Sequence, residues 1–229
     1  MTTTTPHSDR TPTDAARTST WRLLASLAGP ALLALVGFIT PVDDTDEPAD
    51  RLADIFAHEG RYTATLLCLA GGMMLLVPAV LAIRDLAPWA ARRAATVGAV
   101  IAATGFMCFV IASGALGFAP SAWSTLPEAP RTDLLPAFVA MDEGQGALGL
   151  VLVGAPLLPL IGLTVLAVAL WRLRDLPRLA LVALPLGWAM FLFAPVNPMK
   201  SLGALVLAGG IAMLLRHGRV PRSAPYSTQ

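Results

Sequence analysis

The chain has 229 residues, of which 55% are hydrophobic and only 14% are charged, and its formal net charge is +1. A soluble domain of this length carries about a quarter charged residues, so the composition excludes an ordinary soluble domain. It also gives no reason to expect a nucleic-acid partner.

The chain opens with a Thr-rich polar segment, which predicts a disordered tail over residues 1–20. The apolar run 22–40 that follows is long for the core of a signal peptide, and no small-x-small cleavage site comes after it. We therefore expect this run to be retained as a first membrane helix. Residues 217–229 are expected to form a second flexible tail.

Apolar runs dominate the rest of the chain, and a helix of about 20 apolar residues crosses the ~30 Å hydrocarbon core of a bilayer. Six runs are candidates: 22–40, 62–83, 94–117, 146–170, 179–195 and 199–215. The last two are short and contain prolines, so a hairpin that enters the membrane and returns is the alternative for them. The predicted fold class is an all-α, polytopic transmembrane bundle of six helices within residues 21–216.

Arginines predict the orientation of this bundle. They come in threes in alternate connecting segments, namely Arg10, Arg17 and Arg22; Arg84, Arg92 and Arg93; Arg172, Arg174 and Arg178; and Arg216, Arg219 and Arg222. These are 12 of the 16 basic residues, whereas 11 of the 15 acidic residues fall in the other segments. Short basic loops stay in the cytoplasm, so we expect both termini inside, in a bacterial cytoplasmic membrane.

Two segments resemble one another. Residues 59–86 and 143–176 both open with Glu-Gly, continue through an apolar run with proline, and close with Arg-Asp-Leu. Each is followed by a further apolar run. The pattern suggests a parallel repeat in which the second and third helices superpose on the fourth and fifth.

Glu59, Asp142 and Glu143 stand where two predicted helices start on the acidic side. Carboxylates stabilise the N-terminus of a helix, which explains these acids without any function. The alternative hypothesis is catalytic, because two carboxylates that lie close together keep one proton near neutral pH. In that hypothesis the acids face a cavity that binds a lipophilic small molecule, lined by Phe106, Phe109, Trp188 and Phe191.

Several kinds of site have no counterpart in the sequence. There is no Walker A loop, dinucleotide fingerprint, HExxH motif or nucleophile elbow. His7, His58 and His217 are too dispersed to hold one metal ion, so neither a metal nor a cofactor is expected. No charged residue lies near the middle of an apolar run, which disfavours a small carrier or exporter. Small residues at four-residue spacing predict close helix packing, within the chain or in a homo-oligomer: Ala95, Ala99 and Ala103, and Ala204, Ala208 and Ala212.

Residues 49–86, "ADRLADIFAHEGRYTATLLCLAGGMMLLVPAVLAIRDL", resemble a group of small six-helix membrane proteins from high-GC bacteria, with an acidic external loop before a Leu/Gly/Pro helix. The resemblance implies the fold and no activity, and Glu59 stands where that group has proline. In layout alone the chain is similar to integral-membrane terpene cyclases, which implies an acid-catalysed enzyme acting on a prenylated substrate. The two functional interpretations are therefore a membrane protein that binds a lipophilic small molecule and a membrane-embedded enzyme.

Overall fold

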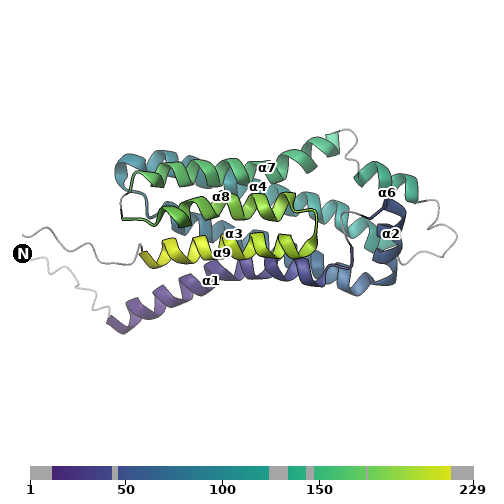
Figure 1. Cartoon of the computed structure of the whole chain (residues 1–229), viewed down its shortest axis with the longest axis horizontal. Coiled ribbons are helices and arrows are strands. Elements are labelled where there is room, and N and C mark those ends of the chain that lie inside the picture. Colours follow the sequence, from purple (N-terminus) through teal and green to yellow (C-terminus); the bar gives the residue numbers. More distant parts are fainter. Residues whose placement is uncertain (1–11, 43–45, 124–133, 143–146, 174, 218–229) are drawn as a thin grey trace, which may run out of the picture.

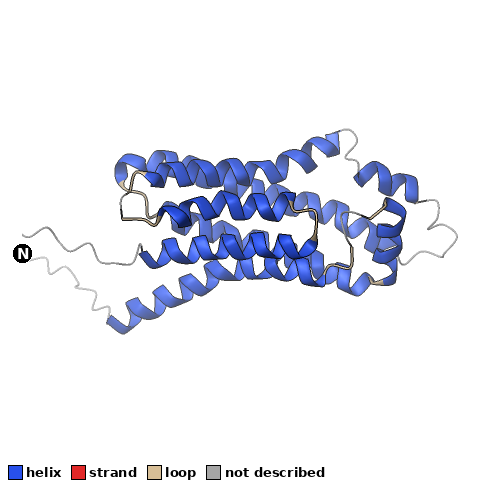
Figure 2. Cartoon of the chain, viewed as in Figure 1, coloured by secondary structure: helices blue, strands red, loops and turns tan. Residues whose placement is uncertain are grey.

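The computed structural model describes residues 12–42, 46–123, 134–142, 147–173 and 175–217 (Figure 1). Within these residues the chain is helical and has no strand, as Figure 2 shows. Eight helices are described: α1 (Pro12–Ile39), α2 (Pro48–Ala57), α3 (Glu59–Arg84), α4 (Trp89–Trp123), α6 (Leu135–Asp142), α7 (Ala147–Trp171), α8 (Arg178–Phe193) and α9 (Asn197–His217).

Each of the six apolar runs falls in a different long helix, so the prediction of an all-α bundle is confirmed. The two additional helices, α2 and α6, lie in segments that were expected to be loops. α1 begins at Pro12, ten residues before the predicted Arg22, inside the segment expected to be disordered. The remaining tail residues, 1–11 and 218–229, lie outside the described part of the chain.

The six long helices pack as a ring in chain order. Each of them contacts the next along the chain, and α9 closes the ring against α1. Figure 1 shows α8 and α9 on one face, α3 and α4 behind them, and α7 and α1 at the two edges. Leucines and small residues fill the interior, including Leu76, Leu166 and Leu184, which are almost completely buried.

Glycines set the distance between several neighbouring helices. A Cβ atom added at Gly98 of α4 would lie 2.8 Å from the carbonyl oxygen of Gly162 in α7, and one added at Gly187 of α8 would lie 2.8 Å from that of Gly203 in α9. Real Cβ atoms do not approach backbone atoms so closely. Glycine is therefore required at these crossings, as in helix pairs within membranes.

Alanines also lie in the interior of the bundle. Ala95, Ala99 and Ala204 of the predicted small-residue series are completely buried within the chain.

The outer surface of the ring is apolar. Large hydrophobic side chains are exposed on every long helix, for example Phe38 of α1, Leu67 of α3, Val168 of α7 and Leu205 of α9. Monomeric soluble proteins rarely expose such continuous apolar surface. Among the described residues, α3, α9 and the segments Trp89–Gly114 and Gly154–Trp171 are long and apolar enough to cross a membrane, and Leu24–Ile39 and Arg178–Phe193 are shorter apolar segments. The fold is compatible with a membrane protein.

The two ends of the bundle differ in charge. The first residue of α1, the last residue of α9 and the α3–α4 and α7–α8 connections lie at one end, and α2 and α6 lie at the other (Figure 1). We call the first the basic end, because its described side chains include Arg92, Arg93, Arg172 and Arg216. The second, the acidic end, carries Glu47, Asp50, Asp54 and Glu59.

Candidate functional site

The four aromatic residues predicted to line a cavity lie together. Trp188 of α8 is at the centre, with its ring 5.1 Å from that of Phe106 and 6.4 Å from that of Phe109, both on α4 and both in edge-to-face geometry. Phe191, one turn further along α8, stacks on Trp188 at 5.6 Å. Such arrangements suit aromatic rings, whose faces are negative and whose edges are positive. We call these four residues the aromatic cluster.

A hydrogen bond fixes the indole at the centre of this cluster. The Nε1–H of Trp188 donates to the carbonyl oxygen of Pro156 in α7 at 3.0 Å, in a buried position. Pro156 and Pro159 both lack a backbone N–H and interrupt the hydrogen bonding of α7 in this region. The indole N–H bonds to α7 close to these two interruptions, and Trp188 thereby connects α8 to α7.

Burial distinguishes the members of the cluster. Phe106 and Trp188 are completely buried and Phe191 is almost so, whereas Phe109 keeps a partly exposed face. The first three belong to the hydrophobic core, and Phe109 packs against that core from its edge. Chemically the cluster is apolar, and Phe109 is its most accessible member.

The structure describes the carboxylate of only one of the three predicted catalytic residues, Glu59. Glu59 is exposed in the first turn of α3, directly after His58, which ends α2 and precedes α3. Asp142 is the last residue of α6, so it does not occupy the cap position of α7, which begins at Ala147. Glu143 and the side chain of Asp142 lie outside the described part of the chain. In that part, no hydrogen bond, ion pair or ring contact joins Glu59 to the aromatic cluster.

The helix α2 lies across the acidic end and is amphipathic. Leu52 and Ile55 are buried on its inner face, and Asp50 is exposed. Pro48 starts the helix and Asp50 lies in its first turn, where each fits the geometry and the dipole. Because α2 contacts α6, α4 and α3, it covers part of the acidic end.

Two polar contacts at this end connect α9 to α1 and to the segment that follows α1, and they were not predicted. The side-chain amide of Asn197 donates to the carbonyl oxygen of Val42 at 2.8 Å, and the hydroxyl of Ser201 donates to that of Ala34 at 2.7 Å. Ser201 is buried and stands against Gly37 of α1. The sequence carries a weak signal for them, a polar pair at four-residue spacing at the start of an apolar helix.

The described histidines and cysteines form no metal centre. The ring Nδ1 of His58 lies 3.3 Å from the carbonyl oxygen of Asp54, and that of His217 lies 2.9 Å from the carbonyl oxygen of Met213. Within the described ranges no group of three or more His, Cys, Asp or Glu residues is placed to hold a metal ion. Cys68 and Cys108 are free and partly buried on the neighbouring helices α3 and α4.

Comparison of the chain with protein-family models, with curated proteins and with solved structures gave no match in any of the three.

Proposed function

We propose that the chain is an integral membrane protein that crosses a bacterial cytoplasmic membrane six times, with its basic end in the cytoplasm. The observation that carries this proposal is the apolar outer surface on all six long helices, with exposed arginines at one end of the ring. Lipid covers such a surface at no cost, and basic connecting segments remain in the cytoplasm.

The shorter apolar segments, Leu24–Ile39 in α1 and Arg178–Phe193 in α8, decide between six crossings and four. Both belong to the closed ring, and α8 packs on α9 through the glycines at 187 and 203. If all six helices of the ring lie in the bilayer, the apolar surface of each helix is covered by either lipid or protein. If α8 stayed at the surface, its partner α9 would expose the face that now meets Gly187.

Reporter fusions test the number of crossings. A reporter active only outside the cytoplasm, joined after residue 41 or after residue 195, should be active in both cases, and one joined after residue 87 should be inactive. Reporter inactivity after residue 195, in a fusion that is made in normal amounts, would contradict six crossings and favour a hairpin.

Within this bundle we propose that the acidic end binds a lipophilic small molecule against the aromatic cluster. The observation in favour is that the cluster draws rings from two helices and keeps Phe109 partly exposed. Apolar sites with a few polar groups at their edge are typical of small-molecule binding. The hydroxyl of Ser201 and the amide of Asn197 already bond to the backbone of Ala34 and Val42, so specificity would come from other polar groups at this end.

Co-purification tests the binding proposal. The protein is purified from its native membrane, and the bound organic-soluble compounds are measured by mass spectrometry. The change Phe109→Ala should deplete any such compound, whereas Phe193→Ala, on the outward face of α8, is the matched control and should not. Equal recovery from the two variants would contradict the proposal.

The enzymatic alternative adds one requirement to this site. An acid-catalysed cyclase needs a protonated carboxyl group near an apolar substrate, and Glu59 together with Asp142 or Glu143 is the proposed source. Incubation of the membrane protein with prenyl substrates tests it. Product formation that Glu59→Gln abolishes would favour the enzyme, and binding without turnover by the wild-type protein would favour a binding protein.

A further inference from the structure

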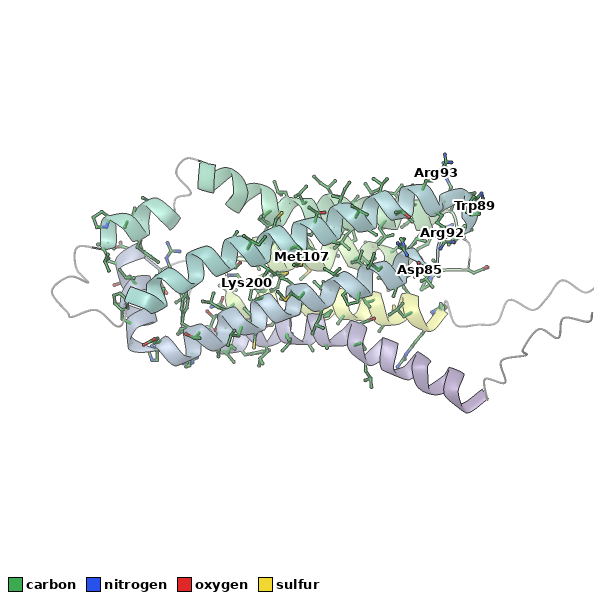
Figure 3. All side chains as sticks on the ribbon, turned by 180° about the vertical axis from the view of Figure 1, so that it is seen from behind. Asp85, Trp89, Arg92, Arg93, Met107 and Lys200 are labelled. Atoms are coloured by element: carbon green, nitrogen blue, oxygen red, sulfur yellow. The ribbon has the colours of Figure 1, made fainter. Side chains whose placement is uncertain are left out.

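The outward face of α4 combines a continuous apolar surface with a basic end. Side chains on this face recur at the three- and four-residue spacing that keeps them on one side of a helix. From the basic end inward, the exposed residues are Trp89, Arg93, Val97, Val100, Thr104, Met107 and Ile111. Figure 3 shows Trp89, Arg92 and Arg93 gathered at the end of the bundle, with Met107 further along the same helix.

Arg93 of this face and its chain neighbour Arg92 form no ion pair within the described residues. Arg92 and Arg93 are exposed and, in the part of the chain that the structure describes, form no hydrogen bond, ion pair or ring contact. Two other arginines of the basic end differ, since Arg84 is paired with Asp85 at 2.7 Å and Arg178 lies 5.9 Å from the ring of Trp171. The guanidinium groups of these two consecutive residues therefore remain available to an anion at the basic end.

Trp89 indicates where the basic end of α4 lies relative to the membrane surface. It is the first residue of α4 and is 87% exposed. An indole in such a position is typical of the interface between lipid headgroups and hydrocarbon. The two arginines lie close to Trp89 in the chain, and aliphatic side chains follow along α4 toward the middle of the bundle. A phospholipid has the same order of groups, from a charged phosphate to an apolar acyl chain.

We infer that this face of α4 binds an anionic phospholipid of the cytoplasmic leaflet, with its phosphate at Arg92 and Arg93 and its acyl chain along Val97 to Ile111. Guanidinium groups hold phosphate through paired, charge-assisted hydrogen bonds. An anionic lipid is favoured over a zwitterionic one because the latter brings its own cation to an already basic corner. The inference rests on the proposed membrane orientation, because it places the basic end at the cytoplasmic leaflet.

Fluorescence quenching by brominated lipids tests the inference. The full-length protein is reconstituted in vesicles with brominated phosphatidylglycerol or brominated phosphatidylcholine, and the quenching of Trp89 is taken as the difference between the wild type and Trp89→Phe. The wild type should show a higher association constant for phosphatidylglycerol. The double change Arg92→Gln/Arg93→Gln should lower that preference by about tenfold to thirtyfold.

Two variants serve as controls. Arg61→Gln removes an exposed arginine at the opposite end of the neighbouring helix α3 and should leave the preference unchanged. Arg92→Lys/Arg93→Lys keeps both charges and should retain most of it. Both glutamine changes preserve helix propensity at exposed sites, so all variants should fold.

Each outcome of the experiment has a distinct meaning. A phosphatidylglycerol preference that is lost only in the double glutamine variant supports the inference. An equal effect of both lipids on the wild type, or a preference that survives the double change, overturns it. If brominated phosphatidylcholine also fails to quench any tryptophan, the protein is not inserted, and the proposed function fails together with the inference.

Discussion

Trp188 is the residue on which most contacts of the candidate site depend. Its ring meets Phe106, Phe109 and Phe191, and its Nε1–H donates to the carbonyl oxygen of Pro156. Each of these contacts joins α8 to another helix or supports the last turn of α8. Removing the indole therefore weakens the connection between α8 and the α4–α7 pair at several points at once.

The substitution Trp188→Phe should lower stability. It leaves the buried carbonyl of Pro156 without this donor and opens a cavity, at a combined cost of about 2–4 kcal/mol. The measurement is the midpoint of thermal unfolding in detergent micelles. Trp89→Phe, at an exposed indole, is the control and should shift the midpoint little. Equal shifts for Trp188→Phe and Trp89→Phe would contradict a stabilising role for the buried hydrogen bond and packing of Trp188.

The sequence allowed the members of the aromatic cluster to be predicted, but not their burial. Phe106, Phe109, Trp188 and Phe191 were placed together because their runs bring them to similar depth near the acidic side. Helices that are apolar on every side carry no periodicity that separates a core-facing ring from a lipid-facing one. Phe191 and Phe193 show the problem, since they lie two residues apart and only the first is buried.

At the scale of elements, the length of the apolar runs in the sequence predicts the long helices but not the short helices α2 and α6. α3 and α9 begin and end within about three residues of the runs 62–83 and 199–215, because charged residues or proline delimit them. α2 has only ten residues, and its inner face buries only Leu52 and Ile55. Tertiary contacts with α3, α4 and α6 stabilise it, and a short window of sequence does not contain them.

The glycine crossings are the element-scale feature that the sequence analysis assigned to other residues. Alanine series on 95–103 and 204–212 were expected to pack closely, and glycines on two helices, which were not named, face each other at the α4–α7 and α8–α9 crossings. Which glycine faces which depends on the rotation of both helices, and uniformly apolar helices do not reveal it.

The substitution Gly162→Ala tests how tightly α4 and α7 are packed. The added Cβ would lie 2.6 Å from the carbonyl oxygen of Gly98, so the helices must separate, at a cost of about 1–3 kcal/mol. Thermal unfolding in detergent measures it. Gly154→Ala on the same helix has open space around the new methyl group and should be neutral or stabilising because alanine favours a helix. Equal stability of the two variants would contradict the packing described for α4 and α7.

At the scale of the whole molecule, the closed ring of helices explains why basic and acidic residues lie at opposite ends. The closed order of the ring brings the arginine-rich connections and both described ends of the chain to one side, and α2 and α6 to the other. The short Arg-Asp-Leu turns contribute, since Leu86 packs against the core and Leu176 is buried at the basic end. The repeat of α3–α4 and α7–α8 stays a prediction, whose measure is the relative depth of Glu59 and Glu143 in a structure determined in lipid.

Cysteine labelling in intact cells tests the central claim most directly. In a background with Cys68 and Cys108 replaced by alanine, single cysteines are introduced at Asp50 in α2 and at Ser8 and Ser223, which lie in the tails outside the described residues. A membrane-impermeant thiol reagent should label Asp50→Cys in intact cells, and Ser8→Cys and Ser223→Cys only after permeabilisation. Labelling of either tail in intact cells, or protection of Asp50→Cys, would contradict a six-crossing bundle with its basic end in the cytoplasm.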